Sequence, residues 1–134
     1  RTGVVLPLTS SATGLAFAAF YRSRYVKKML DAEVLASAAA SNATVETILS
    51  ALNVQLEEIR RHGIARASGS VTPGINGFSA PVFDFSGHMV AAITSLGIIG
   101  NFDMAWDSPM AQSTREAAAT LSRRLGHGSF VVDG

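Results

Sequence analysis

Two apolar runs joined by a short polar turn constrain the fold of this chain most strongly. The first run ends at Phe83, the second begins at Met89, and Phe85-Ser86-Gly87 lies between them. A short turn with a glycine brings two strands back antiparallel to each other. Further glycines within the runs mark points where a backbone bends or is approached closely. The sequence therefore predicts a β-hairpin over residues 74–97.

Helical patterns flank this hairpin on both sides. Three of them begin after a serine or threonine that can serve as an N-cap, and two end at a glycine. In the third pattern, apolar residues recur on one face at helical spacing. The predicted helices span residues 12–22, 25–39, 45–62 and 109–125. The last of them is expected to turn four side chains toward the core: Met110, Ala117, Leu121 and Leu125.

Two further segments are expected to be strands. Residues 4–8 form a short apolar run, and residues 64–68 alternate weakly, as an edge strand does. Strands mixed with helices around a central hairpin indicate an α+β fold with a mainly antiparallel sheet. The length of 134 residues, without an internal repeat or a low-complexity linker, predicts one domain over residues 1–134.

The composition excludes several classes of protein. A net charge of +1 argues against a nucleic-acid-binding face in this segment, because phosphate binding needs clustered basic residues. The lack of cysteine excludes a disulfide scaffold, a thiolate nucleophile and cysteine-based zinc sites, and it agrees with a reducing cytoplasm. No apolar run reaches the roughly 20 residues of a membrane-spanning helix. Because 48% of the residues are hydrophobic, we expect a partner to cover part of the apolar surface.

The polar residues of the hairpin are the candidates for catalysis: Ser79, Asp84, Ser86 and His88. The last three flank a tight turn, where polar residues are normally solvated, and the chain has no Gly-x-Ser-x-Gly motif. The three histidines lack the spacing and the acidic partners of a metal site. We therefore expect no catalytic site, no metal and no cofactor.

Residues 9–14 place several hydroxyls and the first N–H groups of a helix next to one another. Such a helix start can bind an anion through its unpaired donors and the helix dipole. Plain N-capping explains the same residues without a ligand. Both interpretations stay open on the residues alone.

Residues 7–19 match the pattern "PLhatA.GkalLA", residues 73–97 match "PG…(A)AP(V)FD..G.(V)VAA(I)…G", and residues 121–126 match "LS..LG". In this order the segments resemble the C-terminal sensing domain of IclR-type bacterial transcription regulators, over nearly the whole chain. The resemblance implies a GAF-like fold. It also implies that the family's N-terminal winged helix-turn-helix, and the first strands of its sensing domain, are absent from this chain.

In that family the effector lies between the curved sheet and the start of a helix, whose amides commonly receive its carboxylate. By position these amides belong to Ala12 and Thr13. The chain departs from the family at three positions: Leu15 replaces the usual Lys, Ala67 a common acidic residue, and Leu96 a small polar one. A pocket with fewer polar partners favours an aromatic or otherwise hydrophobic effector, with one carboxylate, over a small hydroxy or keto acid. The implied effector-binding residues are Ala12, Thr13, Gly14, Ala67, Ile75, Asn76, Gly77, Thr94 and Leu96.

The resemblance thus implies a small-molecule effector-binding domain of a cytoplasmic regulator. It would form a homodimer or tetramer, contact DNA only through the missing N-terminal domain, and have no membrane partner. One alternative is a GAF-like sensory or dimerisation module with a different output, which a DNA-binding head upstream of Arg1 would exclude. Another is a small hydrolase or isomerase, whose activity replacement of His88 would abolish.

Overall fold

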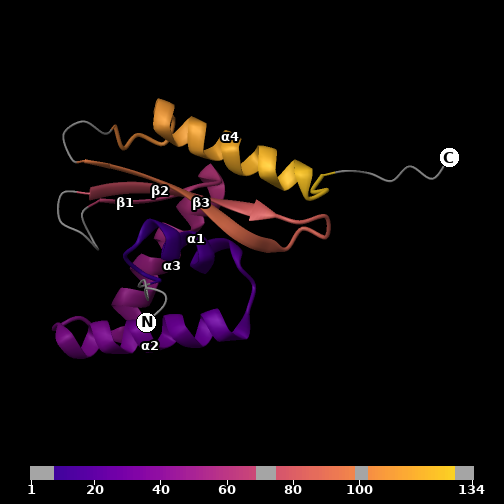
Figure 1. Ribbon diagram of the computed structural model, residues 1–134. Coiled ribbons are helices and arrows are strands. Elements are labelled where there is room, and N and C mark those ends of the chain that lie inside the picture. The colour runs from indigo at the N-terminus through magenta and orange to yellow at the C-terminus, as the bar shows by residue number, and fades with distance from the viewer. Residues whose placement is uncertain (1–7, 69–74, 99–102, 129–134) are drawn as a thin grey trace, which may run out of the picture.

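The computed structural model describes residues 8–68, 75–98 and 103–128, and these form an α+β fold (Figure 1). The sheet is antiparallel, with the strands in the spatial order β1-β2-β3. The fold class inferred from the sequence is confirmed. The strands are β1 (Ala65–Ser68), β2 (Ile75–Phe83) and β3 (Met89–Ile98).

The predicted hairpin and edge strand are both present. β2 pairs with β3, and the turn between them has Gly87 in the left-handed region at φ 82°. The register shifts at Val82 and Phe83, which is a β-bulge or irregularity next to the turn. β1 pairs with β2 and forms one edge of the described sheet. The strand predicted for residues 4–8 lies outside the described residues, except for Leu8, which is part of a turn.

The helices lie on both faces of the sheet. Figure 1 shows α4 over one face, α1 against the other, and α2 farthest from the sheet. The boundaries differ from the predicted ones by at most two residues, and the N-caps Ser11, Thr44 and Ser108 each accept a bond from a first-turn amide. The helices described are α1 (Ala12–Phe20), α2 (Arg24–Ala40), α3 (Val45–His62) and α4 (Pro109–Arg124).

Gly63 ends α3 as predicted, with φ at 71° and its N–H bonded to the Ile59 carbonyl. No atom lies within 4 Å of the position that a Cβ would take there. Replacing Gly63 with Ala therefore has only a backbone cost, and we expect it to lower the free energy of unfolding by about 1 kcal/mol. Gly63→Asn, which tolerates this conformation better, should cost less in the same urea denaturation series. Equal stability of Gly63→Ala and the parent would contradict a left-handed C-terminus.

The alternation of strand side chains divides the core into two apolar clusters. On the α1 side, Leu15 and Ala16 pack with buried residues of α3, Ala65 and Met89. On the α4 side, Phe78 packs with other buried residues of β2, with Ile64 and with two alanines of α4. Small residues dominate α1, so its backbone comes close to the sheet.

The inward face of α4 differs from the prediction. Met110, Ala117, Leu121 and Leu125 all lie on the exposed side. The buried residues are instead Ala111, Thr114, Ala118 and Ser122. The facing strand supplies a hydroxyl as well as apolar surface, since Ser95 Oγ lies 2.7 Å from Thr114 Oγ1. Small side chains with satisfied hydroxyls let the helix lie closer to the sheet than its larger residues would.

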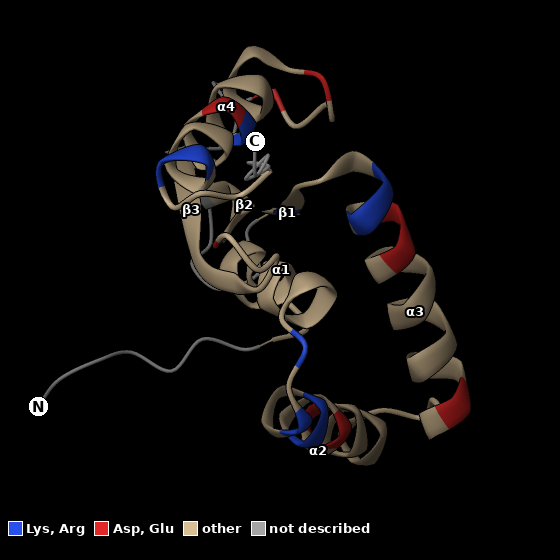
Figure 2. Cartoon of the chain, turned by 90° about the vertical axis from the view of Figure 1, so that its right-hand side faces the viewer, with Lys and Arg blue, Asp and Glu red and all other residues tan. Residues whose placement is uncertain are grey.

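Charged residues of both signs lie on α2, α3 and α4 in Figure 2. Mixed charges of this kind are typical of a solvated helix surface rather than of a phosphate-binding face. Of the helices in the described ranges, none combines the length and the apolar character needed to cross a membrane.

Candidate functional site

The start of α1 lies against the middle of the sheet. Strand pairing aligns Ala67 with Gly77 and Gly77 with Leu96, so these three residues form one row across the sheet. A Cβ on Gly77 would lie 3.5 Å from the Cβ of Ala12 and 3.1 Å from Leu96 Cδ2. The absence of a side chain at Gly77 thus allows the helix start to sit close to the strand.

Hydroxyl groups connect the same helix start to the next row of the sheet. Thr94 Oγ1 donates to the fully buried Ser79 Oγ at 2.9 Å and lies 2.8 Å from Thr13 Oγ1. Because the single hydroxyl hydrogen of Thr94 points to Ser79, Thr13 is the donor in the second bond. This chain of hydroxyls orients the first turn of α1 relative to β2 and β3.

Glu33 of α2 holds the segment that leads into α1. Its Oε2 accepts from the Leu8 amide at 2.9 Å, and its Oε1 accepts from the amide and the hydroxyl of Thr9 at 3.1 and 2.9 Å. The role of Glu33 is not predictable from the sequence, because nothing in the α2 pattern shows that a carboxylate reaches a backbone about 25 residues earlier.

Glu33→Ala removes the acceptor of all three of these bonds. We expect it to lower the free energy of unfolding by about 2 kcal/mol, since hydrogen bonds to a charged group are stronger than neutral ones and partly buried donors would lose their partner. Glu33→Gln keeps one carbonyl oxygen and should lose less. Asp31→Ala, on the exposed surface of the same helix, is the control and should change stability by under about 0.5 kcal/mol. Urea denaturation followed by circular dichroism measures all three variants, and equal losses for Glu33→Ala and Asp31→Ala would contradict this role.

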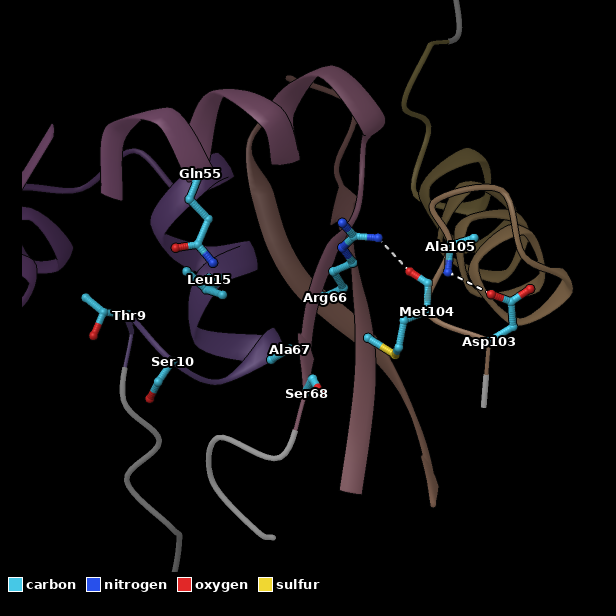
Figure 3. A pocket seen from close by; sticks show the side chains of 10 residues that line it. All are labelled: Thr9, Ser10, Leu15, Gln55, Arg66, Ala67, Ser68, Asp103, Met104 and Ala105. Atoms are coloured by element: carbon cyan, nitrogen blue, oxygen red, sulfur yellow. Dashed lines mark hydrogen bonds between the residues drawn. The ribbon is translucent and has the colours of Figure 1, made fainter. Parts of the chain in front are cut away.

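An open cavity of about 640 Å³ lies beside the outer edge of β1 (Figure 3). In that view the start of α1, one residue of α3, the edge strand and the segment before α4 surround it. Its volume falls in the range of small-molecule sites. The lining residues are Thr9, Ser10, Leu15, Gln55, Arg66, Ala67, Ser68, Asp103, Met104 and Ala105.

The structure brings most of the predicted residues together. Ala12, Gly77 and Leu96 are mutual neighbours, Thr13 and Thr94 share a hydrogen bond, and Ala67 pairs with Gly77 and lines the cavity. Two of the other three residues, Gly14 and Asn76, are placed differently, and Ile75 lies two residues before Gly77 in β2.

The amide of Gly14 is already used, because it donates to Ser11 Oγ at 2.9 Å. Asn76 precedes Gly77 in β2, so its side chain points to the opposite face of the sheet from the α1 start. Asn76 is buried, and its Oδ1 has no hydrogen-bond partner among the described residues. Ile75 pairs with Ile98 through the backbone.

The predicted site did not include Gln55, Arg66 or residues 103–105, which also line the cavity. They come from α3, β1 and the segment before α4, so only the packing of these elements brings them to one place. Leu15 and Ala67 line it as well, and both are positions where the chain departs from the family pattern.

The polar residues of the hairpin turn satisfy one another. Asp84 Oδ1 accepts from the Ser86 amide at 2.9 Å, from Ser86 Oγ at 2.8 Å and from the His88 amide at 3.1 Å. Ser86 Oγ is also 3.0 Å from His88 Nδ1. Because Ser86 gives its hydrogen to the carboxylate, the histidine is not placed to activate it as a base would. This is the geometry of a turn rather than of a nucleophile with its base.

The hydroxyl of Ser86 is the main cause that lowers the pKa of Asp84 below its usual value of 3.8. Ser86→Ala is therefore expected to raise the pKa of Asp84 back toward that value, with Ser113→Ala as an exposed control that leaves it unchanged. NMR titration of the Asp84 carboxyl measures the shift. The folded-state pKa is the lower one, so the stabilising effect of the turn is present above pH 3.8 and is lost as the pH falls through the folded value. An unchanged pKa in Ser86→Ala would contradict the bond.

Within the described ranges, no group of three or more histidine, aspartate or glutamate side chains is arranged to hold a metal ion. The candidate site consists of the α1 start, the Ala67–Gly77–Leu96 row and the adjoining cavity. It offers a ligand apolar surface, hydroxyls, backbone amides and one guanidinium.

Several solved structures contain this fold within a longer chain. The crystal structure of Pseudomonas aeruginosa HmgR matches with a TM-score of 0.78 and 33% identity, over 97% of this chain and 49% of that one. Thermotoga maritima IclR matches with a TM-score of 0.70 and 25% identity, over 95% of this chain and 50% of that one. Agobacterium tumefaciens repressor BlcR, at 23% identity and a TM-score of 0.70 over 95% of this chain and 51% of that one, shows the same fold.

The chain thus spans about half the length of these three structures. A search of curated proteins found no match. The family described as "Bacterial transcriptional regulator IclR C-terminal" matches residues 1–123, which is most of the sequence. The motifs of the hairpin and the α1 start, the α+β fold and this match agree, and the chain belongs to the IclR family of transcription regulators as a C-terminal domain.

Proposed function

We propose that this chain is the effector-binding domain of an IclR-type regulator, and that a small molecule binds between the α1 start and the edge of β1. The observation that supports this most is the open cavity of about 640 Å³ next to the row Ala67–Gly77–Leu96, which consists of three of the predicted residues. A binding site needs a concave surface with few, well-placed polar groups, and the α1 start supplies them. The amides of Ala12 and Thr13 have no acceptor inside the helix, so they are available to a carboxylate.

The proposed effector has an aromatic or otherwise hydrophobic body. Leu15 and Ala67 line the cavity, and Leu96, which is 67% exposed, lies at the end of the row. Each stands where the family pattern carries a charged or polar residue, so a small keto acid would find fewer polar partners at these three positions than that pattern provides. An apolar ring needs no such partner there.

The proposed output is a change in DNA binding. Agobacterium tumefaciens BlcR, which is about twice this length, is described as a repressor, and in this proposal a DNA-binding domain outside this chain contacts the operator. Effector binding would shift the arrangement of subunits in a cytoplasmic homodimer or tetramer, and with it the spacing of the DNA-binding domains. Such a shift requires only that the effector bind one arrangement better than the other.

A thermal-shift screen tests the proposal. Aromatic acids, phenols, small keto acids and hydrophobic solvents are compared at equal concentration. A ligand that binds only the folded chain raises its melting temperature, and we expect a selective rise with aromatic compounds. Gly77→Val serves as the variant with a blocked site, and Ala117→Val, exposed on α4 at the other sheet face, serves as its control. A flat response to the whole panel would contradict the proposal, and a selective response to keto acids would contradict the ligand class.

A further inference from the structure

Arg66 is the only cation that lines the cavity in the described part of the chain. It follows Ala65 and precedes Ala67 in β1, so its side chain leaves the strand on the α4 side of the sheet. Because β1 lies at one edge of the described sheet, a long side chain from that face still reaches the cavity beside the edge. Figure 3 shows Arg66 between the strand and the segment that carries Met104.

The guanidinium of Arg66 is held on two sides. Its Nη1 donates to the Met104 carbonyl at 2.6 Å, and its Cζ lies 3.9 Å from the centre of the Trp106 ring. The ring of His62, at the end of α3, stacks on the same indole with centres 4.3 Å apart and planes within 6°. α3, β1 and the segment before α4 therefore jointly fix the orientation of this one cation.

A guanidinium has five N–H donors in a rigid plane and stays charged at all relevant pH values. The Met104 carbonyl takes a donor of Nη1 and leaves others available. An arginine that is already oriented loses little further conformational entropy when it binds a planar anion. The arrangement suits a carboxylate, which accepts two parallel bonds from such a fork.

The other lining residues fit an organic acid. Leu15, Ala67 and Met104 offer apolar surface, whereas Gln55 and Ser68 add polar atoms. The only opposing charge among the described lining residues is Asp103, which accepts from the Ala105 amide at 3.0 Å and is exposed. Water and salt screen the field of an exposed carboxylate, so it weakens the attraction of an anion to Arg66 without cancelling it.

We propose that Arg66 binds the carboxylate of an organic acid in this cavity, as an anion-binding residue separate from the amides of α1. The inference rests on the proposed effector function and makes Arg66, instead of those amides, the partner of the carboxylate of that ligand. Trp106 holds the guanidinium in place and so is a positioning residue. It is also the only tryptophan of the sequence, so its fluorescence reports directly on what happens at Arg66.

The test compares acids with their neutral amides. Benzoate and phenylacetate, and benzamide and phenylacetamide, are titrated into the purified chain while Trp106 fluorescence and calorimetric heat are recorded. We expect the acids to bind about tenfold more tightly than the amides, the effect of one charge-assisted bond. Arg66→Gln should remove this difference, and Arg66→Lys, which keeps the charge without the fork, should retain part of it. Arg124→Gln, exposed on α4, is the matched control and should behave as the parent.

A second variant leaves Arg66 and its stacking intact. Asp103→Asn keeps the oxygen that accepts from Ala105 but removes the opposing charge, so it should tighten acid binding about twofold and leave amide binding unchanged. Equal binding of acids and amides, or acid binding that is unchanged in Arg66→Gln, overturns the role of Arg66 while effector binding stands. If no compound changes either signal and the thermal-shift panel is also flat, the proposed function fails as well.

Discussion

Phe78→Ala is expected to lower the free energy of unfolding by about 4 kcal/mol, because truncating a buried aromatic ring loses its transfer free energy and leaves a cavity. Phe78 is fully buried and is the largest such side chain in the described part of the chain. Its side chain extends from β2 and packs with Ala111 and Ala118 of α4. Small neighbours of this kind cannot expand to fill the space of a lost ring.

Phe85→Ala is the matched control for that loss. Phe85 lies in the hairpin turn and is 77% exposed, so its truncation should change stability by under about 0.5 kcal/mol. Chemical denaturation followed by circular dichroism measures both variants. Similar losses for the two would mean that α4 does not pack on this face of the sheet.

Gly77→Val is expected to abolish effector binding and to lower the free energy of unfolding by about 2 kcal/mol through overpacking. Two of the atoms around its Cβ position are hard to displace: the Ala12 Cβ and the Ser95 carbonyl oxygen, each at 3.5 Å. The branched methyl groups of valine would extend toward these atoms and push the start of α1 away from the sheet. The loss is measured as the missing thermal shift with compounds that stabilise the parent.

Gly77→Ala separates the effect of adding a Cβ from the effect of the branched methyl groups of valine. Its single methyl group would meet Leu96 Cδ2 at 3.1 Å, the far end of an exposed side chain that can rotate away. This variant should therefore fold with a loss below about 1 kcal/mol and keep most of the thermal shift. Full ligand response in Gly77→Val would show that the effector does not bind at this row.

Local signals determined much of the fold in advance. The hydroxyl caps Ser11, Thr44 and Ser108, the stop at Gly63 and the turn at Gly87 act through backbone bonds a few residues away. A sequence contains such short-range information explicitly, and the predicted boundaries were therefore close. The motif order likewise led to the IclR family, which the match over residues 1–123 confirms.

The sequence determined less about which surfaces meet. The prediction of which residues of α4 face the core was wrong. It placed the most hydrophobic residues, such as Met110 and Leu121, on the inner face, whereas Thr114 is buried there because its hydroxyl bonds to Ser95 of the sheet. Side-chain bonds over long separations, such as Glu33 to Thr9, have no periodic signal at all. Neither does the stacking of Arg66 and His62 on Trp106.

The candidate site likewise has features that the sequence indicates and features that depend on tertiary packing. The sequence indicated the α1 start and the residues Ala67, Gly77 and Leu96 through its resemblance to the IclR pattern, but not that these three residues form one row across the sheet. Only the tertiary structure decided that Asn76 faces away from that row and that α3, β1 and the segment before α4 meet around one cavity. The physical reason is that packing and long-range hydrogen bonds depend on the shape of the facing element, which no single segment of the sequence specifies.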